Sequence, residues 1–191
     1  MIKNKFKNIQ LILASQSPRR KELLSSLDLS FESFTKNIDE SYPANMAPNL
    51  VAKYLSEIKS EAYAIKDNEI LITADTIVIH QSKILNKPKD KLHAKEMLKL
   101  ISNSSNIVMT GVCIRSNKKQ LSFAASTEVT FEKLEENEIE FYIENFHPLD
   151  KAGAYGIQDW IGKIGIKNIN GCYYNVMGLP IHRLYQELKQ F

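Results

Sequence analysis

One aspartate interrupts a strongly apolar run of the sequence. Asp75 stands within LITADTIV, residues 71–78, and Thr76 follows it. Burying a carboxylate without a partner is costly, so this side chain must pair with a cation, bind a metal ion or lie at a strand end beside a cleft. An aspartate that caps a loop or pairs with a lysine would serve the fold alone, and the run by itself does not decide. Glu40, in NIDESYP, is a second acid in a loop-like context, where a solvated turn residue is the alternative.

Two adjacent arginines follow a segment that is typical of a helix start. Ser17 is a good N-cap, and Pro18 suits the first helical position, where no backbone N–H is needed. Arg19 and Arg20 then come at the positive end of the helix dipole, where acidic residues would be the stabilising choice. Local stability does not explain this pair, whereas a bound anion would.

Three lysines extend the set of candidate anion-binding groups. Lys87 precedes a proline, which holds it in an extended conformation, and Lys151 follows Asp150 and precedes small residues that allow close backbone approach. Lys59, in EIKSEA, is the third, and each lysine taken alone could be a solvated surface charge. Together, cations, a helix start and a strand carboxylate are what a magnesium-polyphosphate ligand needs, because cations and helix N–H groups neutralise phosphate oxygens while a carboxylate holds Mg²⁺ or orients water.

Other site classes lack their motifs. The sequence has no GxxxxGK[ST] phosphate-binding loop, no GxGxxG between a strand and a helix, and no GxSxG elbow. The four histidines and the two cysteines, Cys113 and Cys172, have no metal-ligand spacing. These absences argue against P-loop, dinucleotide-binding, serine-hydrolase and zinc sites.

Composition limits the class of protein. The 191 residues suffice for one substantial core, or for a core with a small lobe, and a net charge of +3 is too small to indicate nucleic acid as the partner. The basic start MIKNKFKNIQ lacks the apolar stretch of a signal peptide, and no apolar segment approaches the roughly 18 residues of a membrane span. We therefore expect a soluble, cytoplasmic protein that binds neither nucleic acid nor membrane, and we leave a homodimer open.

The candidate residues are distributed over alternating strands and helices. Periodicity predicts strands at 11–13, 30–36, 69–80, 106–116 and 120–131, and helices from Ser17 onward and at 49–65, 90–102, 134–145 and 179–190. Six of the seven glycines fall in 151–180, which we expect to be mostly loop and to carry part of a site. The order indicates a mixed α/β fold around one central sheet.

Six motifs, taken together, resemble the Maf-like proteins. LASQSPRRKELL, ADTIVI, NKPKD, TGVCI, DKAGAYGIQ and NGCYYNVMGLP occur in the order and at about the spacing of that family, over roughly residues 9–188. The resemblance implies a single domain, 1–191, with an elongated mixed β-sheet flanked by helices, and two lobes with a central cleft, similar to inosine-triphosphate-pyrophosphatase-like folds. It also implies a nucleoside triphosphate pyrophosphatase of a family historically known as septum formation inhibitors.

The resemblance assigns roles to individual residues. Asp75 matches the proton acceptor, and Glu40 with Asp75 would hold a divalent cation, Mg²⁺ or else Mn²⁺ or Co²⁺. The polar cleft positions match Ser15, Ser17, Arg19, Arg20, Glu40, Lys59, Lys87, Asp150 and Lys151. Water would attack the α-phosphorus of a bound nucleoside triphosphate and release pyrophosphate. A non-catalytic nucleotide-binding regulator of cell division and a general phosphosugar-binding domain are the alternatives.

Three positions bear on the nucleobase. Arg19, Thr76 and Gln158 match the subfamily that acts on dTTP and UTP, and an amide such as Gln158 can offer both a donor and an acceptor to the O4/N3–H edge of thymine or uracil. The chain departs from the family pattern at three further places, Asn106, His147 and Asp159. His147 and Asp159 flank the expected base pocket.

Overall fold

The structure is a computed structural model that describes residues 2–191, and the chain forms two compact units. Unit 1 consists of the chain up to Asp75 together with Thr110–Ala125 and Gly178–Phe191. Unit 2 consists of Thr76–Met109 and Ser126–Met177. Asp75 is therefore the last residue of the first segment of unit 1.

The expected mixed α/β fold around one sheet is confirmed, and the sheet has seven strands, two more than the sequence predicts. Its order is β2-β1-β3-β5-β6-β7, with β4 paired to β3. β1 is parallel to β2 and β3, whereas the pairs β3–β4 and β6–β7 are antiparallel. The strands are β1 (Gln10–Leu13), β2 (Phe31–Ser33), β3 (Glu69–His80), β4 (Lys83–Leu85), β5 (Ser105–Arg115), β6 (Gln120–Phe131) and β7 (Ile166–Asn170).

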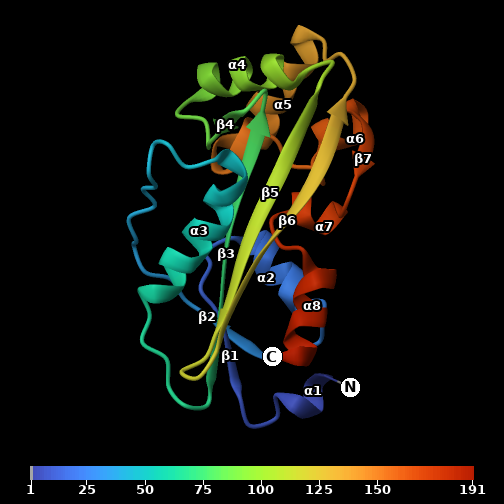
Figure 1. Ribbon diagram of the computed structural model, residues 1–191. Coiled ribbons are helices and arrows are strands. Elements are labelled where there is room, and N and C mark those ends of the chain that lie inside the picture. Colours follow the sequence, from blue (N-terminus) through green and yellow to red (C-terminus); the bar gives the residue numbers. More distant parts are fainter. Residues whose placement is uncertain (1) are drawn as a thin grey trace. The chain divides into compact units, whose positions relative to one another are not determined.

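Unit 1 packs helices against its part of the sheet. They are α1 (Ile2–Lys5), α2 (Pro18–Ser25), α3 (Pro48–Glu61) and α8 (Ile181–Gln190). Figure 1 shows α3 alongside β3 and β5. This close approach requires Gly111, because a Cβ at that position would lie 2.2 Å from the carbonyl oxygen of Ala52 on α3. At the other end of α3, Arg115 donates from Nη2 to the carbonyl oxygens of Ser60 and Tyr63, both at 2.5 Å.

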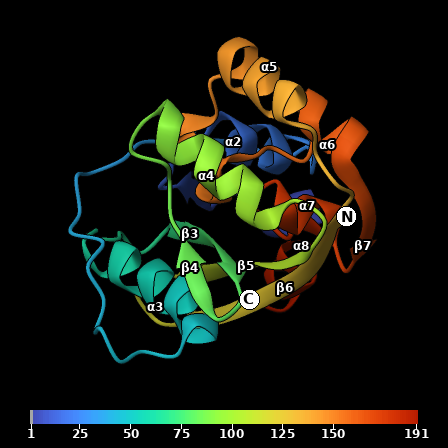
Figure 2. The same cartoon turned by 90° about the horizontal axis from the view of Figure 1, so that it is seen from above.

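Unit 2 has its own apolar core, which includes Val78, Phe131 and Tyr142. Its helices are α4 (Lys91–Ile101), α5 (Glu136–Phe146), α6 (Trp160–Gly165) and α7 (Tyr173–Val176), with 3-10 turns η1 (Pro148–Asp150) and η2 (Ala152–Ala154). Figure 2 shows α4 and α5 side by side. Ion pairs join these two helices, from Lys95 Nζ to Glu136 at 2.8 Å and to Glu140 at 2.6 Å.

Most of the predicted elements, the short strand β1 and the long strand β3 among them, agree with the structure to within two residues, and two predicted bounds differ by more. The predicted strand at 30–36 is only Phe31–Ser33, and the helix predicted to end at 65 ends at Glu61. The segment 151–180 is not mostly loop: it contains η2, α6, β7 and α7. β7 forms because the edge of β6 supplies hydrogen bonds to it, a tertiary contact that local sequence does not encode. Over residues 2–191, no helix combines the length and the apolar character that crossing a membrane requires.

Candidate active site

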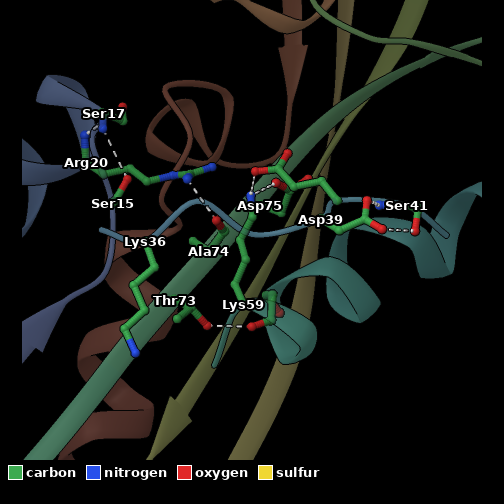
Figure 3. Close-up of polar contacts among 12 residues, drawn as sticks. Ser15, Ser17, Arg20, Lys36, Asp39, Ser41, Lys59, Thr73, Ala74 and Asp75 are labelled. Atoms are coloured by element: carbon green, nitrogen blue, oxygen red, sulfur yellow. Dashed lines mark hydrogen bonds and ion pairs between the residues drawn. The ribbon is translucent and has the colours of Figure 1, made fainter. Parts of the chain in front are cut away.

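Asp75 lies near the middle of β3 and is buried, with 8% of its surface exposed. Its Oδ1 accepts a hydrogen bond from Lys59 Nζ at 2.5 Å, and the same ammonium contacts Glu40 Oε1 at 2.9 Å (Figure 3). The lysine is therefore shared by two carboxylates. The Lys59 side chain is 14% exposed and that of Glu40 is 56% exposed. The three charged groups therefore run from the buried Asp75 through Lys59 to Glu40 at the surface. The structure thus brings together three candidates that are distant in sequence. Glu40 and Lys59 are 19 residues apart, and Lys59 and Asp75 are 16 residues apart.

Helix α3 determines where Lys59 lies. Thr73 Oγ1 donates to the carbonyl oxygen of Ser56 at 2.5 Å, which joins α3 to β3 two residues before Asp75 (Figure 3). Lys59 occupies the last turn of this helix, where a cation also interacts favourably with the negative end of the dipole. The hydrogen bond between α3 and β3 and the position of Lys59 in the last turn thus place its ammonium beside Asp75.

The start of α2 is built as the sequence predicts. Ser17 is the N-cap, its Oγ accepts from the backbone N–H of Arg20 at 3.4 Å, and Pro18 is the first helical residue. Ser15 is buried and its Oγ accepts from the N–H of Ser17 at 3.2 Å. The two serines therefore fix the backbone at this helix start. Arg19, the next candidate, is half-buried in the first turn.

Arg20 has partners that the sequence does not reveal. Its Nη1 donates to the carbonyl oxygen of Ala74 and its Nε to that of Gly178, each at 2.8 Å. Burial lowers the pKa of the Arg20 guanidinium, and the nearby carboxylate of Asp75 opposes that shift. Arg20 thus anchors the start of α2 to the strand residue immediately before Asp75, a structural role in addition to the phosphate contact predicted from the sequence.

The remaining candidates belong to unit 2. Lys151 has a side chain only 11% exposed, and its Nζ contacts Asp150 Oδ1 at 2.8 Å and Asp159 Oδ2 at 3.6 Å. Gln158 is half-buried, and its Oε1 is buried without a hydrogen-bond partner among residues 2–191. Thr76 is half-buried next to Asp75, and Lys87 is exposed.

The three positions at which the sequence departs from the motifs named above are Asn106, His147 and Asp159, and the structure shows their surroundings. Asn106 is buried, and it donates to the carbonyl oxygen of Val129 at 3.3 Å and accepts from the Tyr155 hydroxyl at 2.9 Å. His147 has φ of 46° and ends α5 in the left-handed region. Asp159 accepts a hydrogen bond from the Tyr142 hydroxyl at 2.8 Å. Tyr142 is a residue that sequence reasoning missed, since within a helix it looks like any core aromatic.

The carboxylates of Glu40 and Asp75 both contact the Lys59 ammonium, and carboxylate oxygens are suitable ligands for a divalent cation. Mg²⁺ is commonly held by one or two carboxylates together with substrate phosphates and water. Glu40 and Asp75 provide such a pair, because both contact Lys59 Nζ. Residues 2–191 contain no cluster of three or more His, Cys, Asp and Glu side chains suited to a metal ion, so any cation here would need further oxygen ligands from substrate or water.

Comparison with known proteins establishes the family. A model of the Maf-like protein family matches residues 10–191, and the chain belongs to that family. A protein of Porphyromonas gingivalis named dTTP/UTP pyrophosphatase is 50% identical over 190 residues, which covers 97% of this chain and 96% of that protein. One of the same name from Bacteroides thetaiotaomicron is 50% identical over 184 residues, 95% of each chain. Among solved structures, the Staphylococcus aureus Ham1 protein overlaps 64% of this chain and 71% of its own, with a TM-score of 0.47 and 12% identity.

Proposed function

We propose that this chain is a nucleoside triphosphate pyrophosphatase that hydrolyses dTTP and UTP to the monophosphate and pyrophosphate. The observation that carries the proposal is the buried Asp75, whose carboxylate contacts the Lys59 ammonium that Glu40 also contacts, in a chain half identical to proteins named dTTP/UTP pyrophosphatase. A buried carboxylate beside cationic groups is suited to accept a proton from water next to a phosphate.

Each residue has a defined task in this reaction. Arg19, Lys59 and Lys87 neutralise the phosphate oxygens, aided by the N–H groups at the start of α2 around Ser15 and Ser17. Asp75 accepts the proton of a water molecule as its oxygen attacks the α-phosphorus. The bond from that phosphorus to the oxygen bridging the α- and β-phosphates breaks, and pyrophosphate leaves. Arg20 keeps the backbone before Asp75 in place.

A divalent cation belongs to the proposal. Glu40 and Asp75 would hold it, and when bound it supplies Lewis-acid polarisation of the phosphoryl oxygens. Lys59 contacts both carboxylates in this structure, so it is the residue whose contacts must change when a cation binds there. Mg²⁺ is the expected ion, with Mn²⁺ or Co²⁺ as substitutes.

The nucleobase is assigned to unit 2 through Gln158, with Thr76 and Arg19 contributing to the choice of base. Oε1 of Gln158 is a buried acceptor without a partner among residues 2–191, and the N3–H of thymine or uracil is a matching donor. Asp150 and Lys151 are assigned to substrate binding on the same segment. We also propose the cytoplasm as the place of action, since the free thiols Cys113 and Cys172 suit a reducing compartment.

The test is a panel of nucleoside triphosphates assayed for pyrophosphate release with Mg²⁺, Mn²⁺ or Co²⁺. We expect dTTP and UTP to be cleaved far better than dCTP, ATP or GTP. Asp75→Asn should abolish turnover and keep the fold, because the change preserves shape and removes the charge. Asp39→Asn is the matched control. Asp39 precedes Glu40 in the sequence, it is exposed, and its carboxylate accepts hydrogen bonds from Ser41.

The outcomes separate the alternatives. Activity of Asp75→Asn within about tenfold of wild type, which corresponds to roughly 1.4 kcal/mol of barrier, would exclude Asp75 as proton acceptor. Nucleotide binding without release of pyrophosphate would favour the non-catalytic regulator instead. Equal rates for dCTP and dTTP would remove the base assignment and leave the pyrophosphatase class intact.

A further inference from the structure

The turn that contains Gln158 is held at both ends by one hydroxyl group. The N–H of Asp159 donates to the carbonyl oxygen of Gly156 at 3.0 Å, which closes the turn. The Tyr142 hydroxyl accepts from the N–H of Gly156 at 3.0 Å and donates to Asp159 Oδ2 at 2.8 Å. Gln158 lies between the two residues that this hydroxyl joins.

The side chains of Asp159 and Lys151 lie against Gly156 in this turn. A Cβ there would lie 2.5 Å from Asp159 Oδ2 and 3.0 Å from Cε of Lys151. Lys151 Nζ is 3.6 Å from the same carboxylate oxygen. The Asp159 side chain therefore folds back over the turn, between the Tyr142 hydroxyl and the Lys151 ammonium.

Tyr142 is a rigid support for this arrangement. It lies on α5, is fully buried within the core of unit 2, and stacks on Phe146 with ring centroids 5.4 Å apart. Burial, together with the neighbouring Asp159 carboxylate, raises the pKa of the Tyr142 hydroxyl far above its ordinary value. The hydroxyl therefore keeps its proton and remains a donor to Asp159.

We propose that Asp159 and Tyr142 are positioning residues that hold the backbone of the turn carrying Gln158, which limits where its carboxamide can lie, so that its Oε1 selects nucleobases with a ring N–H donor. Thymine and uracil present N3–H, whereas the N3 of cytosine is an acceptor and would face another acceptor. An amide free to move could satisfy either edge. A fixed turn restricts which orientations of the Gln158 amide can reach the base, and discrimination depends on that restriction. This inference rests on the proposed function, because it names how the same site chooses its substrate.

The experiment compares variants that remove the hydroxyl contact with one that removes a similar hydroxyl elsewhere. Tyr142→Phe and Asp159→Ala should lower the ratio of kcat/KM for dTTP to that for dCTP by at least tenfold. Asp159→Asn should largely retain the ratio, since its amide oxygen can still accept from Tyr142. Tyr155→Phe is the control, because it removes another buried hydroxyl of unit 2, the one that donates to Asn106. It should lower the melting temperature and leave the ratio unchanged.

Two readouts do not depend on turnover. Calorimetric affinities for dTMP and dCMP should converge in Tyr142→Phe and Asp159→Ala. Fluorescence of Trp160, the single tryptophan and the residue after Asp159, should change in these two variants and remain unchanged in Tyr155→Phe.

The results distinguish the two proposals. If wild type cleaves no nucleoside triphosphate but prefers dTMP over dCMP, and the variants lose that preference, the pyrophosphatase proposal fails and the positioning role stands. If wild type prefers dTTP and all variants keep its ratio, the positioning role is wrong and the pyrophosphatase proposal stands. If wild type binds neither monophosphate and cleaves no triphosphate, both are wrong.

Discussion

Arg20→Ala should separate the anchoring role of this arginine from a role in phosphate affinity. In the structure the guanidinium donates to two backbone carbonyl oxygens, those of Ala74 and Gly178. Loss of the first contact frees the backbone immediately before Asp75, so kcat should fall as well as stability. A residue that only bound phosphate would instead raise KM and leave the melting temperature nearly unchanged.

The magnitude follows from the contacts. Hydrogen bonds to charged groups contribute about 1.5–3 kcal/mol each, so two contribute roughly 3–6 kcal/mol. Burial of the guanidinium, which lowers the pKa of Arg20, and its position at a helix N-terminus offset part of this sum. We expect a net loss of about 2–4 kcal/mol of unfolding free energy, or about 4–16 °C in melting temperature for a chain of this size.

Urea unfolding and pyrophosphate-release kinetics measure the two effects on the same samples. Arg183→Ala is the matched control: Arg183 Nη1 also donates to a backbone carbonyl oxygen of unit 1, that of Ala124 at 2.7 Å, and its side chain is about half exposed. It should lower stability slightly and leave kcat unchanged. A stable Arg20→Ala protein with a raised KM and normal kcat would refute the anchoring role.

Three further predictions test the surroundings of the site and the fold. Lys59→Met should destabilise the protein by about 3–5 kcal/mol, because it leaves the buried Asp75 carboxylate without its cation. Adding Asp75→Asn to this variant should restore part of the lost stability. Equal stabilities of the single and double variants would contradict the pairing of Lys59 with Asp75. Gly111→Ala should cost about 1–3 kcal/mol or more in urea unfolding, and wild-type stability would contradict the close approach of α3 to β5. Hydrogen bonds from Lys95 and Lys99 lower the pKa of Glu136 from 4.5 to about 2, so its stabilisation is present above pH 4.5 and lost as the pH falls through about 2. The excess melting temperature of wild type over Glu136→Gln should follow that course and shrink in high salt, whereas a difference independent of pH would refute it.

The sequence alone determines the order of the long elements, and it draws attention to the charged residues that we propose for the site. Hydrophobic periodicity and β-branched composition locate β3, β6 and α4 to within a residue, because both reflect burial of one face or of a whole strand. The cap at Ser17 and Pro18 is equally local, since it depends only on groups within one helical turn. The acid at Asp75 is conspicuous because a charge in an apolar strand needs a partner, although the strand does not say which partner.

Only the tertiary structure decides which distant groups meet. Arg20 reaches Gly178, 158 positions away, and the Tyr142 hydroxyl joins the two ends of the turn at Gly156 and Asp159. Lys59 contacts Asp75 because α3 packs closely on β3 and β5. The Thr73 hydroxyl donates a hydrogen bond to α3, and Gly111 lets the helix approach because it has no side chain. Patterns in the chain encode burial and hydrogen bonds within a turn or a strand. Hydrogen bonds between distant segments exist only where the packed sheet and helices bring a donor and an acceptor to within about 3 Å of each other.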